Sequence, residues 1–99
     1  MLMPTKVESI ACGILKQYPV KKAALFGSAA RGNTTNQSDI DMLVEFLPNT
    51  RGIEFFGLRV DLEEALGCPV DLITWNALSK ANPAFKQAVE REARLIYGS

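Results

Sequence analysis

The chain has 99 residues, of which 47% are hydrophobic and 22% are charged, so we expect residues 1–99 to form a single domain with one core. Lys plus Arg and Asp plus Glu both number 11, and the resulting net charge of zero argues against non-specific binding to nucleic acid. The sequence has no histidine, which excludes Ser-His-Asp and Cys-His catalysis and leaves acid–base chemistry to carboxylates, lysine or tyrosine.

The first segment predicts an amphipathic helix over residues 5–18, because its apolar residues recur at helical spacing until Pro19. A strand follows and runs into Gly27. We interpret the two lysines before it, Lys21 and Lys22, as a solvated strand start rather than as groups that steer phosphate.

Gly27 stands at the strand end, where a glycine allows the backbone to approach a phosphate closely. The residues from Ser28 to Arg31 can open a short helix whose N–H groups attract anions, and the Ser28 hydroxyl adds a donor at the same place. Residues 33–38 contain no apolar side chain, so we expect an exposed loop that borders the site.

The next strand carries a pair of carboxylates. Apolar and polar residues alternate from Asp39 to Phe46, so Asp39 and Asp41 share one face with α-carbons roughly 6.6 Å apart. Two carboxylates this close repel each other, and a divalent cation is the usual reason for them to coexist. With Mg²⁺, such a pair can hold two ions around a transferring phosphoryl group.

The remaining chain predicts a helix over residues 53–66, a strand over 70–74, a helix over 83–91 and a strand over 95–97. Gly67 is expected to cap the C-terminus of the helix over 53–66. Three acidic residues of that helix, Asp61, Glu63 and Glu64, are interpreted as a solvated face.

Asp71 lies in the strand over 70–74 between Val70 and Leu72, and its apolar neighbours predict partial desolvation. It is either an edge-strand acid that points to water or a third carboxylate of the metal site, and the residues alone leave both interpretations open. The two cysteines, Cys12 and Cys68, are too few to complete a zinc site without histidine, so we expect both to be buried as small apolar groups.

Gly27-Ser28, ten further residues and then Asp39-x-Asp41 form a pattern that resembles the signature of the DNA-polymerase-beta-like nucleotidyltransferase superfamily. The fuller segments GSAARG and SDIDMLV resemble its minimal nucleotidyltransferase (MNT) branch. Ala29 departs from the pattern, since the family often has a larger residue there, and this difference concerns packing more than chemistry.

The resemblance implies an α/β fold with a small mixed β-sheet of three to four strands and helices packed against it. It also implies a nucleotidyltransferase that uses ATP and Mg²⁺. The implied metal-holding residues are Asp39, Asp41 and Asp71, and Asp71 can also accept the proton of an attacking hydroxyl. Gly27 and Ser28 would grip the phosphates, while Arg31 would either stabilise phosphate charge or pair with a nearby acid.

Members of the family that act on small molecules or nucleic acids usually carry extra domains for acceptor binding, and this chain has no room for one. It is more similar to the stand-alone members of the MNT branch, which are typically partnered with a HEPN-domain protein. The resemblance therefore implies an antitoxin that transfers AMP to a toxin tyrosine. The alternative is a binding module that neutralises its partner by contact without turnover. No apolar run approaches the ~20 residues of a membrane span and no signal-peptide pattern is present, so we expect a cytoplasmic location without membrane association.

Overall fold

The computed structural model describes residues 4–27 and 39–98. The elements in these residues are α1 (Pro4–Leu15), β1 (Val20–Phe26), β2 (Ile40–Phe46), α3 (Gly52–Leu66), β3 (Val70–Thr74), α4 (Trp75–Ser79), α5 (Pro83–Glu92) and β4 (Arg94–Gly98). Among the helices of these residues, none is long and apolar enough to cross a membrane.

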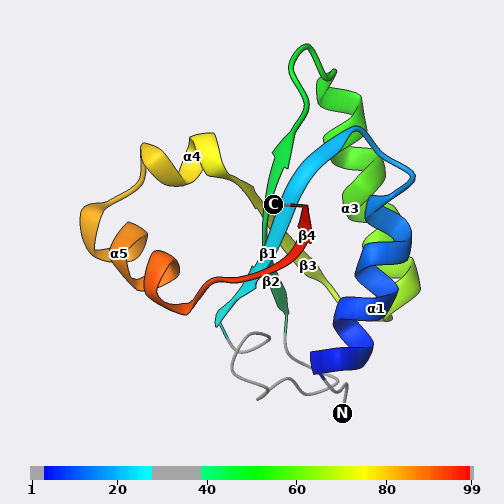
Figure 1. Ribbon diagram of the computed structural model, residues 1–99, viewed down its shortest axis with the longest axis horizontal. Helices are drawn as coiled ribbons and strands as arrows, with labels where there is room; N and C mark the ends of the chain where they lie inside the picture. The colour runs from blue at the N-terminus through cyan, green and yellow to red at the C-terminus, as the bar shows by residue number, and fades with distance from the viewer. Residues whose placement is uncertain (1–3, 28–38, 99) are drawn as a thin grey trace.

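The four strands form one mixed sheet in the order β3-β2-β1-β4, as Figure 1 shows. β1 pairs antiparallel with both β2 and β4, whereas β2 and β3 are parallel and are connected through α3. A parallel pair needs such a crossover, which is usually helical. The expected mixed α/β sheet is confirmed.

One face of the sheet is covered by α1 and α3 (Figure 1). Leu58 and Leu62 of α3 are fully buried, and they lie four residues apart on one side of the helix. Alternate residues of β2, among them Ile40 and Met42, point into the same core. This core is the larger of two apolar clusters in the described residues.

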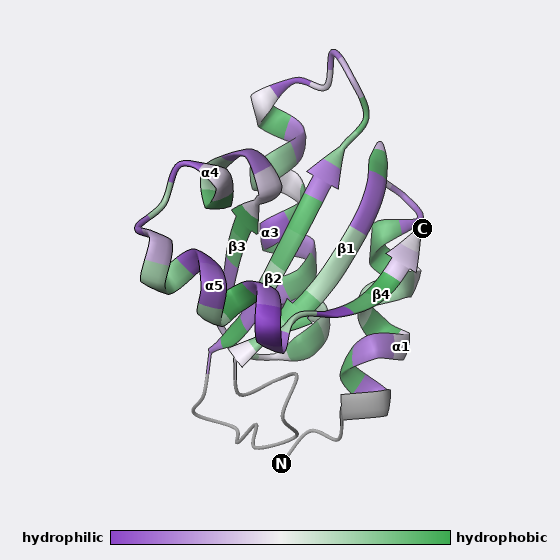
Figure 2. Ribbon diagram, turned by 60° about the vertical axis from the view of Figure 1, so that its left-hand side comes forward, coloured by the Kyte–Doolittle hydropathy of each residue, from purple (hydrophilic) through white to green (hydrophobic). Residues whose placement is uncertain are grey.

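The opposite face is covered by α4 and α5 and holds the smaller cluster (Figure 2). Its buried members are Ala24, Phe26, Leu43, Leu78 and Val89. The central strands β1 and β2 therefore contact helices on both faces, and this accounts for their nearly continuous apolar sequence.

Two element boundaries differ from the sequence-based expectation. Helix α1 ends at Leu15 instead of residue 18, because Pro19 disfavours helical backbone at the residue before it. Residues 16–19 form tighter turns instead, in which Tyr18 N–H donates to the Leu15 carbonyl at 3.2 Å. Helix α4 was not expected, and it begins where the Thr74 side chain accepts a hydrogen bond from Ala77 N–H.

The acidic residues of α3 are not all solvated, which corrects the expectation for that helix. Asp61 accepts a hydrogen bond from the Tyr18 hydroxyl, and Glu63 accepts one from Val70 N–H at 3.0 Å. Of the three acids in that expectation, only Glu64 is exposed. The other two connect α3 to the α1–β1 turn and to the start of β3.

Candidate functional site

Gly27 follows the last residue of β1 and has a positive φ of 66°. A Cβ placed on this residue would overlap the carboxylate of Asp41. Both observations favour glycine here, since other residues avoid this backbone region and a Cβ would have to displace the Asp41 carboxylate. The end of β1 is thereby held directly against the Asp41 side chain.

Asp41 and Asp71 occupy neighbouring positions on two parallel strands. The register pairs Asp41 of β2 with Phe26 of β1 on one side and with Asp71 of β3 on the other. Paired residues on adjacent strands lie on the same face about 4.8 Å apart. The structure therefore brings Asp71 beside Asp41, although the two are 30 residues apart in sequence.

Asp39 lies just before β2 and borders a cavity of about 200 Å³ together with Asp71. Both of these acids are exposed, whereas Asp41 is half-buried. The desolvation expected for Asp71 from its apolar sequence neighbours is wrong, because Val70 and Leu72 point to the other face and are buried there. The carboxylate itself faces solvent at the edge of the sheet.

Ser28 and Arg31 were predicted to contact phosphate, and both lie outside the described residues, as does the polar segment 33–38. Their roles stay predictions.

Two residues of the cavity were missed by sequence reasoning. Phe55 and Arg59 of α3 line it together with four consecutive residues from Pro69 to Leu72. Their spacing of four residues places them on the same side of the helix. The spacing indicates from sequence that the two residues share a side of the helix. Only the packing of α3 against β3 shows that this side borders the candidate site.

Cys68 lies in the turn that leads from α3 into β3, near Asp39 and Glu63. Burial raises the pKa of its thiol, and the nearby carboxylates of Asp39 and Glu63 raise the pKa further. The thiol is thus kept in its protonated, unreactive form. Cys68 is buried as expected, while Cys12 is half-buried and donates its thiol to the Ile96 carbonyl at 3.0 Å.

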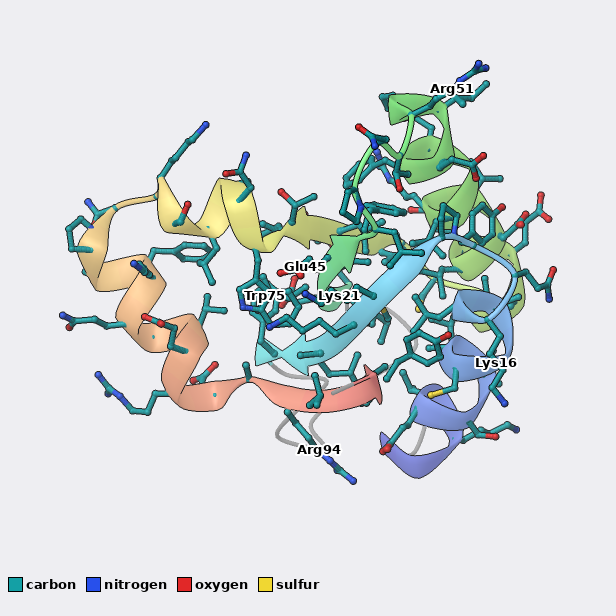
Figure 3. All side chains as sticks on the ribbon, turned by 45° about the horizontal axis from the view of Figure 1, so that its top comes forward. Lys16, Lys21, Glu45, Arg51, Trp75 and Arg94 are labelled. Carbon is teal, nitrogen blue, oxygen red and sulfur yellow. The ribbon has the colours of Figure 1, made fainter. Side chains whose placement is uncertain are left out.

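The opposite end of β2 and β3 holds a larger cavity of about 540 Å³, but none of the sequence-predicted site residues lines it. There Lys21 pairs with Glu45 at 3.4 Å, and both are labelled in Figure 3. The Lys22 ammonium lies 4.5 Å from the ring centre of Trp75. Lys22 is five residues from Gly27, or about 16 Å along the strand. Both lysines therefore lie at the end of the sheet opposite the candidate site.

Residues 4–27 and 39–98 contain no group of three His, Cys, Asp or Glu side chains arranged as a metal site. The donors at the candidate site are carboxylate oxygens, which hard cations such as Mg²⁺ prefer. Mg²⁺ is usually held by one or two carboxylates together with phosphates and water. The donor set of Asp39, Asp41 and Asp71 fits that mode of binding.

Residues 7–96 match the family described as "Nucleotidyltransferase domain". A relative from Methanocaldococcus jannaschii, named "Putative protein adenylyltransferase MJ0128", is 45% identical over 85 residues, which are 85% of this chain and 83% of the relative. "Protein adenylyltransferase MntA" from Thermococcus cleftensis is 34% identical over 82 residues, covering 79% of this chain and 83% of the relative.

Two solved structures have a similar fold. A toxin–antitoxin crystal structure with AMP-PNP matches with a TM-score of 0.72 and 26% identity, over 93% of this chain and 73% of that chain. A tri-AMPylated Shewanella oneidensis HEPN toxin in complex with its MNT antitoxin matches with a TM-score of 0.70, over 98% of this chain and 74% of that chain. Identity to the second is 23%, so this likeness concerns the fold alone.

Proposed function

The chain belongs to the nucleotidyltransferase domain family, in its minimal nucleotidyltransferase branch, and on that premise we propose that it transfers AMP from ATP to a partner protein. The acceptor that we propose is a tyrosine of a HEPN-domain toxin, so that the chain acts as the antitoxin of the pair. The observation that carries this proposal is the pairing of Asp41 with Asp71 on adjacent strands, with Gly27 against the Asp41 carboxylate.

In this proposal Asp39, Asp41 and Asp71 would hold Mg²⁺, which when bound would supply positive charge opposite the phosphate groups. Gly27 and Ser28 contact the phosphates of ATP, and Arg31 is available for the same task. Asp41 is the best positioned of the three acids, because Gly27 and the neighbouring strands restrict its side chain.

The transfer step exchanges one phosphorus–oxygen bond for another. The tyrosine oxygen attacks the α-phosphorus of ATP, the bond from that phosphorus to the oxygen bridging the α- and β-phosphates breaks, and pyrophosphate leaves. Asp71 accepts the proton of the tyrosine hydroxyl. Its exposed carboxylate at the sheet edge is accessible to a protein acceptor, and general base assistance of this kind contributes roughly 10²–10⁴-fold.

The proposal is tested by incubating the chain with ATP, Mg²⁺ and a purified HEPN-domain protein, followed by intact-mass spectrometry of that protein. We expect an added AMP on the HEPN protein and none when ATP is omitted. Formation of a stable complex without any adduct would favour the non-catalytic binding module instead. Absence of both adduct and complex would reject the HEPN partner.

A further inference from the structure

The cavity that Asp39 and Asp71 border extends around the outer edge of β3. Among the described strands β3 is at the margin of the sheet, next to β2 only (Figure 2). Side chains from both faces can therefore line a hollow beside it. Asp71 points to one face, while Phe55 and Arg59 approach from α3 on the other.

The size of this cavity suits a single side chain. Its volume of about 200 Å³ is below the roughly 300–1,000 Å³ of sites that enclose drug-sized ligands, and it has room for one large side chain. Asp39 and Asp71, which border it, are both exposed, so a side chain of a partner protein can reach it.

The walls of the cavity combine apolar and charged groups. Pro69, Leu72 and the half-buried ring of Phe55 form the apolar part. The polar part consists of Asp39, Asp71 and Arg59. An aromatic ring with a hydroxyl matches both parts, because its carbon atoms can pack on Phe55 while the oxygen lies beside Asp71.

Arg59 is held at the cavity by its neighbour one helical turn later. Its Nε atom lies 3.7 Å from Oε2 of Glu63, which is a long ion pair, and half of the Arg59 side chain is exposed. The same Glu63 oxygen accepts the hydrogen bond from Val70 N–H at 3.0 Å and is thereby fixed to β3. A loose contact to an anchored acid keeps the guanidinium near the hollow and leaves it able to turn toward an occupant.

We propose, resting on the protein adenylyltransferase function above, that this cavity binds the acceptor tyrosine, with its ring against Phe55 and its hydroxyl between Asp71 and the Arg59 guanidinium. Arg59 therefore positions the tyrosine oxygen beside Asp71, which takes its proton. Serine and threonine side chains lack the ring that fills the hollow.

A kinetic test uses Arg59→Ala with the HEPN-domain protein as acceptor, and Arg91→Ala as the matched control on the exposed side of α5. We expect Arg59→Ala to raise KM for the acceptor about tenfold, equivalent to ~1.4 kcal/mol, with KM for ATP changed less than about twofold. Arg59→Lys should restore part of the acceptor affinity, and Arg91→Ala should match the wild type.

An increase in KM for ATP instead would assign Arg59 to the nucleotide, and unchanged values for both substrates would remove it from the site. Either result overturns the proposal.

A second test does not depend on turnover. N-acetyl-tyrosinamide is titrated into the isotope-labelled protein, and we expect NMR shifts to concentrate at Phe55, Arg59 and the Val70–Leu72 backbone, with much smaller shifts from N-acetyl-serinamide. Shifts confined to other parts of the chain would overturn the tyrosine site even if AMP transfer is found. Shifts at the cavity without any AMP transfer would retain the tyrosine site and reject the adenylyltransferase function.

Discussion

The contact that most directly shapes the candidate site joins two single residues, Gly27 and Asp41. Gly27 has a φ of 66° and leaves no room for a Cβ beside the Asp41 carboxylate. The obstructing atoms belong to a side chain that can rotate, so an added methyl group would displace the carboxylate rather than the backbone of β2. A substitution here should therefore affect the chemistry more than the fold.

We predict that Gly27→Ala lowers the rate of AMP transfer at least ~10-fold and lowers the free energy of unfolding by about 1–2 kcal/mol through backbone strain. Gly13→Ala is the matched control, because Gly13 lies in α1 with no atom near its missing Cβ, and there alanine should be neutral or stabilising. Transfer assays and urea unfolding measure the two effects. A Gly27→Ala protein with the wild-type rate would contradict the assigned contact.

A second contact between two single residues, Tyr18 and Asp61, lies away from the candidate site and is a hydrogen bond. The Tyr18 hydroxyl donates to the Asp61 carboxylate, and this hydrogen bond, with smaller effects from burial and from the charges of Asp61 and Glu54, raises the pKa of Tyr18 to about 12. The ring lies against Gly57, where a Cβ would come within 3.2 Å of the hydroxyl oxygen. The contact links the turn after α1 to α3.

This contact predicts a specific pH dependence. The pKa of Tyr18 is higher in the folded state than the usual value near 10. The stability that its hydroxyl contributes is therefore fully present below pH 10 and is lost as the pH rises through about 12. Tyr18→Phe should have a lower free energy of unfolding than the wild type at pH 8, and this difference should narrow between pH 10 and 12. Urea unfolding of both proteins across this range measures the difference, and a constant difference would show that the hydrogen bond does not stabilise the fold.

At the scale of elements, α3 has two apolar sides with different environments. Leu58, Leu62 and Leu66 are buried against the sheet. On the outer side, Ile53 is 71% exposed, Phe56 62% and Val60 50%. The stability that α3 contributes should therefore come from its inner side alone.

We predict that Leu62→Ala lowers the free energy of unfolding by about 2–5 kcal/mol, the range for a cavity in a closely packed core. Val60→Ala, two residues earlier on the outer side, should change it by less than about 0.5 kcal/mol. Denaturant unfolding of both variants tests the difference. Equal losses would mean that the outer side of α3 also packs in the folded protein.

Much of the secondary structure was predictable, because periodicity and end signals are local. The strand over 70–74 and the Gly67 cap were found from such signals, and Asn82 caps α5 as the Asn-Pro pair indicates. Other predictions failed because they depended on distant partners. Asp61 resembled a solvated acid because its partner, Tyr18, lies 43 residues away.

At the scale of the whole molecule, the sheet order brings three distant segments to one end. The end of β1 supplies Gly27, the start of β2 supplies Asp39 and Asp41, and the start of β3 supplies Asp71. Spacing alone placed Asp39 beside Asp41, since both belong to one alternating run. The position of Asp71 required the parallel pairing of β2 with β3, which local sequence does not encode, and the contribution of Phe55 and Arg59 required the packing of α3 against that edge.

The central claim is that the Asp41 carboxylate serves AMP transfer and not the fold. It is tested most directly by following the AMP adduct on the HEPN-domain protein by intact-mass spectrometry, with wild type, Asp41→Asn and the exposed-surface control Glu90→Gln. We predict that Asp41→Asn lowers the rate by at least ~10²-fold with an unchanged circular dichroism spectrum, while Glu90→Gln matches the wild type. A folded Asp41→Asn protein that transfers AMP at a near-normal rate would contradict the account.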